Sequence, residues 1–205
     1  MADELMLYEP ILWEPEAGYF LLEQHLARLE RSAGHFGFPF DGHGVRSRLA
    51  DFAVQLDRPR KVRVWLGSDG ELTVESEDVK PTTPIPVALA GKPVDSSDPL
   101  LRHKTSRREV YDRELGAHPE AKDVLLWNER RELTETCHGN VVLEISGRRL
   151  TPPLSAGLLP GTFRAHLLAQ GAIEAAPLGL ADLKRAERIF MINSVRKWVE
   201  ARLVS

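Results

Sequence analysis

The sequence predicts an α+β, or mixed α/β, fold with two lobes, and three observations lead to this prediction. Hairpin patterns occur in both halves of the chain, at residues 60–79 and 139–153. Segments with helical spacing lie between the strand patterns, so helices and strands mix. Residues 91–105 contain prolines, serines and a glycine without periodicity, which is typical of a linker. We therefore expect a small N-terminal lobe over residues 1–91 and a larger C-terminal lobe over 92–205, not a doubly wound parallel sheet.

The N-terminal lobe is expected to combine strands with two helices. In order these are a strand at 5–13, a helix within 18–38, a second helix at 41–56, the hairpin at 60–79 and a strand at 85–90. Pro10 interrupts the first strand and favours an edge position or a bulge, because proline has no amide hydrogen. Gly34 or Gly37 is expected to end the first helix.

The C-terminal lobe is expected to start with a helix and continue with strands. The expected elements are a helix around 105–116, a strand at 123–128, the hairpin at 139–153, a helix within 158–171, and a short helix leading into an apolar strand at 180–194. Pro160 near the start and Gly171 at the end of the fourth of these segments follow the usual asymmetry of helix termini.

The composition narrows the class of protein. The 205 residues are 42% apolar and 28% charged, with a net charge of −3, which is typical of a globular protein and gives no support to a nucleic-acid surface. Cys137 is the one cysteine, so neither an internal disulfide nor a thiolate-rich zinc site is expected, and no metal site is predicted. The N-terminus lacks a secretory pattern and no apolar run is long enough to span a bilayer, so we expect a cytoplasmic protein without membrane contact.

One lysine stands among several cationic side chains. Lys104 follows His103, and arginines lie at positions 102, 107 and 108. A solvated helix start would explain this pattern. A lysine that has to lose its proton would explain it too, since nearby cations favour the neutral amine.

Four further stretches contain polar groups that fit both a structural and a binding role. Glu135, flanked by hydroxyls, reads either as a solvated hairpin residue or as a paired functional carboxylate. The sequence Pro160-Gly161-Thr162 at a helix start is either plain helix entry or an anion site. Arg28, beside an apolar helix face, either extends to solvent or points inward at a phosphate or carboxylate. Ser194 and its neighbour Asn193 end an apolar strand, where polar ligands are often placed.

The order of these features resembles a known family. The stretches HLARL with the following SA, HKTSRREVYD, LTETCHGNVV and LTPPLSAGLLPGTFR resemble the class IV aminotransferases, which are fold-type IV pyridoxal-phosphate enzymes. Within that family the likeness is greatest to 4-amino-4-deoxychorismate lyase. The resemblance runs over nearly the whole chain. It implies a two-lobe fold like that of D-amino-acid aminotransferase, with a shortened N-terminal lobe.

The resemblance also implies roles for individual residues. Lys104 would bind pyridoxal 5′-phosphate covalently and then move protons, and Glu135 would pair with the pyridine nitrogen. The other residues that it implies as cofactor contacts are Arg28, Gly161, Thr162 and Ser194 at the phosphate and Asn140 near the ring.

The implied activity is the release of pyruvate from 4-amino-4-deoxychorismate to form 4-aminobenzoate, a step of folate biosynthesis. An aminotransferase acting on branched-chain or D-amino acids, or a cofactor-binding homologue without turnover, would use the same lysine and carboxylate. The resemblance further implies a small amino substrate and a homodimer. Three positions depart from the family pattern: Pro10 stands where lyases commonly have a hydroxyl, Leu12 replaces an arginine, and Arg107 often corresponds to an asparagine.

Overall fold

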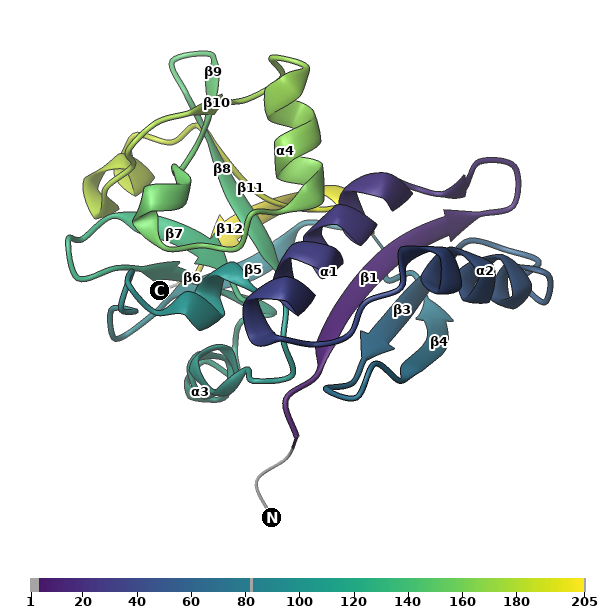
Figure 1. Ribbon diagram of the computed structural model, residues 1–205. Helices are drawn as coiled ribbons and strands as arrows, with labels where there is room; N and C mark the ends of the chain where they lie inside the picture. The colour runs from purple at the N-terminus through teal and green to yellow at the C-terminus, as the bar shows by residue number, and fades with distance from the viewer. Residues whose placement is uncertain (1–3, 82, 205) are drawn as a thin grey trace. The chain divides into compact units, whose positions relative to one another are not determined.

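The computed structural model describes residues 4–81 and 83–204, which form two compact units. The first unit joins the chain up to Lys80 with His103–Arg107, and the second joins Pro81–Arg102 with the chain from Arg108 onward. Both units mix helices with strands, as the sequence predicts (Figure 1). The lobe boundary expected between residues 91 and 92 stays a prediction.

The first unit is a sheet of four strands in the order β2-β1-β3-β4, and all neighbours in it are antiparallel. The strands are β1 (Leu7–Glu14), β2 (Gly18–Tyr19), β3 (Arg60–Leu66) and β4 (Leu72–Asp78). Helices α1 (Leu22–Phe36) and α2 (Gly42–Ala53) contribute apolar side chains to one core with β1 and β3. Gly37, with φ of 73°, ends α1, so the second of the two expected glycines is the one used.

Pro10 lies where β1 has no partner strand on one side among the described residues. It is opposite Arg63 of β3, and β2 pairs only with the end of β1. The amide of Tyr8 points away from β3, toward Lys104, and Pro10 two residues later has its nitrogen on the same side. The missing amide hydrogen therefore removes no bond to β3, although β1 lies between β2 and β3 and is not an edge strand of this sheet.

The segment 103–107 extends along the start of β1. Thr105 forms a bridge with Leu7, and the amide of Ser106 donates to the carbonyl of Met6 at 2.8 Å. The helix expected from residue 105 therefore starts later, as α3 (Glu109–Ala117), because the preceding residues are extended against a strand. The expectation of a helix at 105 was wrong for this reason.

The second unit is built on a sheet of eight strands, six of which close into a ring. Hydrogen-bonded neighbours run β8-β11-β12-β5-β6-β7, and β7 pairs again with β8. The strands are β5 (Ile85–Leu89), β6 (Asp123–Trp127), β7 (Leu133–Thr136), β8 (Gly139–Ile145), β9 (Arg148–Thr151), β10 (Glu174–Ala175), β11 (Arg188–Asn193) and β12 (Lys197–Leu203). Only the β12–β5, β5–β6 and β9–β10 pairs are parallel among the described strands, so the sheet is not doubly wound.

The helices of the second unit are short. They are α3, α4 (Thr162–Ala169) and three 3₁₀ segments at Pro99–Arg102, Leu154–Ala156 and Leu180–Lys184. Helix α4 starts directly after Gly161, which is its N-cap, and Gly171 with φ of 66° follows its end. Strands β7 and β12 were not predicted as separate strands. Across residues 4–81 and 83–204, no helix has the length and apolar character needed to cross a bilayer.

Candidate active site

Lys104 lies in the first unit, beside β1. Its carbonyl accepts the amide of Tyr8 at 3.0 Å, and its Nζ lies 5.0 Å from the centre of the Tyr8 ring. The amine therefore stands over an aromatic face at the edge of the sheet, on a backbone held by strand pairing. An extended backbone fixes the direction of a side chain more narrowly than a free loop does.

His103 points to helix α1. Its Nδ1 is 2.9 Å from the hydroxyl of Ser32, and its ring stacks on that of His35 with centroids 4.4 Å apart. Phe36 meets the same ring edge-on at 5.0 Å. These contacts anchor the residue before Lys104 to the helix, so His103 helps to fix the backbone of the lysine.

Arg28 of α1 is buried and held by a carboxylate that the sequence patterns did not single out. Its Nε donates to Oε1 of Glu9 at 2.7 Å and its Nη2 to Oε2 at 2.6 Å, which is the two-pronged geometry that suits guanidinium and carboxylate. Nδ1 of His25 lies 2.6 Å from Oε2 of the same carboxylate. Arg28 thus points inward, with at least part of its charge directed at Glu9, and its predicted contact with a phosphate stays a prediction.

The electrostatics of this cluster follow from its burial and its charges. Burial raises the pKa of a carboxyl, but the charge of Arg28 and the hydrogen bonds from Arg28 and His25 outweigh it and lower the pKa of Glu9 to about 2. Burial lowers the pKa of His25, although Glu9 opposes the effect. At neutral pH the ionised carboxylate can only accept, so Nδ1 of His25 is the donor.

The alternation of residues along the first strand could have predicted that Glu9 is buried. It has the same parity as Leu7 and Ile11, which are fully buried, so it faces the core of the sheet. A carboxylate at a core position needs a cationic partner or hydrogen-bond donors. Arg28 and His25, on the buried face of the adjacent helix, supply that partner.

Glu135 lies in the second unit, on β7, and is 4% exposed, so it is not a solvated hairpin residue. It is the cross-strand partner of Asn140 on β8, in a tight hairpin closed by Cys137 and His138. The Asn140 Nδ2 donates to Oε2 of Glu135 at 3.4 Å and to the carbonyl of Leu159 at 3.0 Å. The hairpin register therefore brings two of the predicted site residues together.

Two further donors contact this carboxylate within the unit. The phenol of Tyr111 on α3 donates to Oε1 of Glu135 at 2.9 Å, and the amide of Leu159 donates to Oε2 at 3.2 Å. Arg164, which is also buried, has its pKa lowered by burial, and the charge of Glu135 opposes that effect. Tyr111 belongs to the quoted stretch HKTSRREVYD but was not assigned a role from the sequence.

Gly161 and Thr162 stand at the start of α4, with Thr162 buried. A Cβ at position 161 would lie 2.0 Å from Oδ1 of Asn140, so the glycine is needed for this close approach. Backbone amides in the first turn of a helix lack partners within the helix and favour an anion. Asn140 therefore links the carboxylate of Glu135 to the segment that leads into this helix start.

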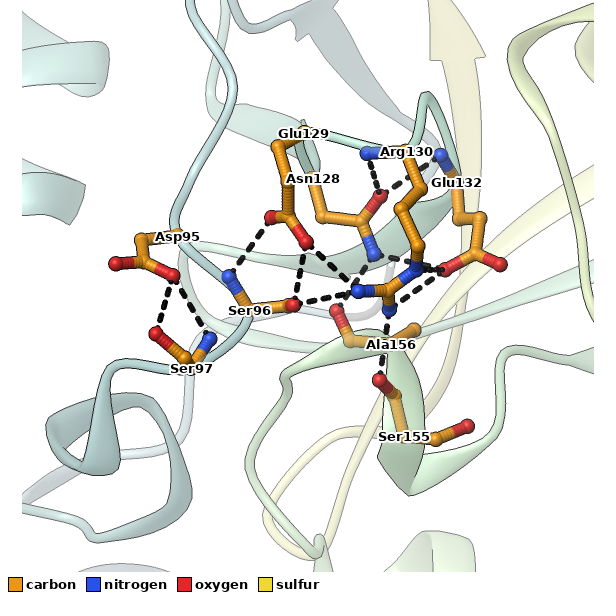
Figure 2. A network of polar contacts seen from close by, with 9 residues as sticks. All are labelled: Asp95, Ser96, Ser97, Asn128, Glu129, Arg130, Glu132, Ser155 and Ala156. Atoms are coloured by element: carbon orange, nitrogen blue, oxygen red, sulfur yellow. Dashed lines mark hydrogen bonds and ion pairs between the residues drawn. The ribbon is translucent and has the colours of Figure 1, made fainter.

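A polar network holds the chain just before that segment (Figure 2). Arg130 donates to the hydroxyl of Ser96 at 2.7 Å, to Glu132 at 2.9 Å and to the carbonyl of Ser155 at 2.8 Å. The fully buried Asn128 donates to the carbonyl of Ala156 at 2.9 Å. Three separate segments are thus tied together, and residues 155 and 156 enter the 159–162 stretch from a fixed position.

Asn193 and Ser194 end β11, as expected, but the amide of Asn193 has a structural role. Its Nδ2 donates to the carbonyl of His138 at 3.1 Å, and its Oδ1 accepts the amides of Val195 and Arg196. These bonds hold the turn before β12. Ser194 itself is buried. Its predicted contact with a phosphate stays a prediction.

The remaining candidates for a reactive or metal-binding site are the cysteine thiol and clusters of possible metal ligands. Cys137 is buried, and burial raises the pKa of its thiol, which keeps it protonated and unreactive. In the part of the chain that the structure describes, no cluster of His, Cys, Asp and Glu side chains could hold a metal ion. Arg107 is exposed on the segment of the first unit that contains Lys104.

Comparison of the chain with known protein families identifies the family to which it belongs. The family model for class IV amino-transferases matches residues 6–204, almost the entire chain. The chain belongs to the class IV aminotransferase family. The resemblance seen in the sequence is thereby confirmed, and so is its implication of an enzymatic, pyridoxal-phosphate-dependent family.

Individual relatives carry two different descriptions. A Schizosaccharomyces pombe protein named "Putative aminodeoxychorismate lyase" is 32% identical over 95% of this chain and 88% of its own length. The crystal structure of a "Putative amino-acid aminotransferase" from Mesorhizobium loti has a TM-score of 0.92 and 35% identity, and covers 98% of this chain and 100% of that one. A "Putative 4-amino-4-deoxychorismate lyase" from Legionella pneumophila shares the fold at a TM-score of 0.86 with 21% identity, over 97% of this chain and 82% of that one.

Proposed function

We propose that this enzyme is a pyridoxal-phosphate-dependent lyase that converts 4-amino-4-deoxychorismate to 4-aminobenzoate and pyruvate. The observation that supports this choice of reaction is the 32% identity to the S. pombe protein over 95% of the chain. The chemistry of the side chains fits the cofactor. Glu135 is a buried carboxylate held by hydrogen bonds, Gly161 leaves room at a helix start, and Lys104 lies on a fixed backbone.

The roles of the residues in this proposal follow from their chemistry. Lys104 would bind the cofactor through its amine, and Glu135 would accept a hydrogen bond from the ring nitrogen. Arg28, Thr162, Ser194 and the backbone at Gly161 would bind the phosphate, and Asn140 positions Glu135. Pyridoxal phosphate, when bound, supplies the electron sink that stabilises negative charge at the amino-bearing carbon of the substrate.

The lyase reaction needs one proton removed and one bond broken. The proton leaves the amino-bearing ring carbon and is taken by the amine of Lys104, which acts as the general base. The carbon–oxygen bond to the enolpyruvyl group then breaks, the ring becomes aromatic, and the leaving group gains a proton to become pyruvate. Atoms balance without any further reactant.

An aminotransferase is the second candidate, and the 35% identity to the Mesorhizobium loti protein favours it. Both reactions start with proton removal by the same lysine, and they differ in the bond changed next. Leu12 and Pro10, which depart from the family pattern, lie on β1, the strand whose start contacts the lysine segment, and are the positions to vary if the substrate differs. A homodimer, a cytoplasmic location and a role in folate biosynthesis complete the proposal.

The test is to supply purified protein with pyridoxal phosphate and record its visible absorbance spectrum. Wild type is expected to show the band of the lysine-bound cofactor, and Lys104→Ala to lack it. Lys92→Ala is a matched control, because Lys92 is exposed. Release of 4-aminobenzoate and pyruvate from 4-amino-4-deoxychorismate then supports the lyase, whereas formation of a keto acid from an amino acid supports the aminotransferase. A wild-type protein without any cofactor band would exclude both.

A further inference from the structure

Tyr111 connects helix α3 to the carboxylate on β7. It lies in the first turn of α3, and its hydroxyl donates to Oε1 of Glu135 at 2.9 Å. The other oxygen, Oε2, accepts from the amide of Leu159 at 3.2 Å and from Asn140 at 3.4 Å. Donors on both oxygens fix the rotation of the carboxylate plane, and the phenol donates on the Oε1 side.

The phenol is itself held in place. The guanidinium of Arg108 lies 4.7 Å from the centre of the Tyr111 ring and also donates to the carbonyl of Cys137 at 2.9 Å. Cys137 in turn directs its thiol to the carbonyl of Tyr111 at 3.7 Å. These contacts tie the first turn of α3 to the end of β7, so the donor and its acceptor move together.

Tyr111 stays a donor over the working pH range. Burial and the adjacent charge of Glu135 raise the pKa of the phenol, while Arg108 acts in the opposite direction. A neutral donor orients a carboxylate without cancelling its charge. A carboxylate that is fixed in direction and still charged is what a protonated ring nitrogen requires as its partner.

Building on the proposed function, we propose that Tyr111 is a positioning residue that orients Glu135 for the cofactor's ring nitrogen. Tyr111 acts through Glu135 and does not itself take part in the chemistry. It follows that loss of the phenol hydroxyl weakens only the part of cofactor binding that depends on the ring nitrogen.

The test compares two cofactors on the same full-length protein. Apo-protein is titrated with pyridoxal phosphate and with the analogue in which carbon replaces the ring nitrogen, and the dissociation constants are measured by absorbance. Tyr111→Phe is expected to weaken binding of pyridoxal phosphate roughly three- to tenfold and to leave binding of the analogue unchanged. Tyr19→Phe is the matched control, because its phenol donates to the carbonyl of Leu49 at 2.8 Å, in the other unit. It should change neither constant.

Each outcome has a definite meaning. Equal weakening for both cofactors, or no weakening for either, overturns the positioning role of Tyr111. The proposed function is judged separately, by whether wild type binds pyridoxal phosphate and whether Glu135→Gln removes its preference over the analogue. If wild type fails to bind pyridoxal phosphate, both the function and the role of Tyr111 are rejected.

A second measurement needs no change at position 111. The chain has 3 tyrosines, so protein labelled with ¹³C at the phenol carbon gives a simple NMR spectrum, in which Tyr8→Phe and Tyr19→Phe identify the third signal by elimination. Pyridoxal phosphate is expected to shift the Tyr111 signal more than the analogue does. Equal shifts with the two cofactors would overturn the proposal even if Tyr111→Phe does not fold.

Discussion

Two buried glutamates, one in each unit, are stabilised in different ways. Glu9 on β1 is held by side chains that can carry positive charge, with Arg28 at 2.6 Å and His25 at 2.6 Å. Glu135 on β7 accepts from three neutral donors, the phenol of Tyr111, the amide of Leu159 and the side chain of Asn140. In the first arrangement the hydrogen bonds come from groups that can carry positive charge. In the second, these three hydrogen bonds come from neutral groups and fix the direction of the carboxylate.

The two kinds of partner suit the two carboxylates to different roles, one in stability and one in cofactor binding. A buried ion pair depends strongly on both members, because removal of one leaves the other as an uncompensated buried charge. A carboxylate held by neutral donors tolerates an amide in its place, because an amide can both accept and donate within the same contacts. Glu9 is therefore expected to matter most for stability and Glu135 most for cofactor binding.

The largest expected effect on stability comes from Glu9→Gln. Loss of the carboxylate charge leaves Arg28 buried without that partner, and we expect a loss of about 3–5 kcal/mol in the free energy of unfolding. Glu135→Gln is expected to cost about 1 kcal/mol, because its donors can be satisfied by an amide. Unfolding in urea measures both values.

Glu23→Gln serves as the control for this pair of variants. Glu23 pairs with Arg46 at 2.6 Å, but both side chains are exposed to solvent, so we expect a much smaller loss of stability than for Glu9→Gln. Equal losses for Glu9→Gln and Glu135→Gln would contradict the distinction between the two carboxylates.

The second-largest expected effect is a loss of folding stability at acidic pH, caused by Glu9 and His25 in the first unit. The pKa of Glu9 is lowered from 4.5 to about 2, so the unfolded chain binds the proton more readily and stability is lost as pH falls through this interval. Burial also lowers the pKa of His25. The unfolded chain therefore binds this proton more readily, and the contribution of His25 to the free energy of unfolding is lost as pH falls below 6.5. For Glu9 we expect a loss of about 3 kcal/mol between pH 4.5 and 2.

Urea unfolding at a series of pH values measures this loss. The difference in stability between wild type and Glu9→Gln should shrink steadily from pH 4.5 downward, because protonation removes the charge that the variant lacks. A difference that stays constant down to pH 2 would show that the carboxylate charge of Glu9 is not what stabilises the cluster.

The smallest of the three effects concerns the contact between Asn140 and Gly161. A Cβ at position 161 would approach Oδ1 of Asn140 to 2.0 Å, so Gly161→Ala forces a shift that we expect to cost about 1–3 kcal/mol. The same change should weaken cofactor binding, since Asn140 also donates to Glu135. Gly91→Ala is the control, because a Cβ added at Gly91 would meet no atom within 4 Å among the described residues.

A double-mutant cycle sharpens this result. In the Asn140→Ala background, Gly161→Ala should cost clearly less, because the atom that obstructs the new methyl group has been removed. Additive losses would mean that the penalty at position 161 comes from elsewhere.

Much of the architecture was predictable because local periodicity determines it. The hairpin of β3 and β4, the helices α1 and α2 and the entry into α4 at Thr162 all follow from apolar spacing and from glycine and proline positions. The start of α3 was not predictable in the same way. Thr105 and Ser106 are extended because β1, about a hundred residues earlier, offers hydrogen bonds to them.

The site shows the same division between local and long-range causes. The sequence by itself determined the family, through Lys104, Glu135 and the stretch that leads into α4, because these motifs are local and specific. The tertiary structure alone decided that Glu9 holds Arg28 and that Tyr111 holds Glu135. These pairs join residues 19 and 24 positions apart, across elements whose packing no local pattern records.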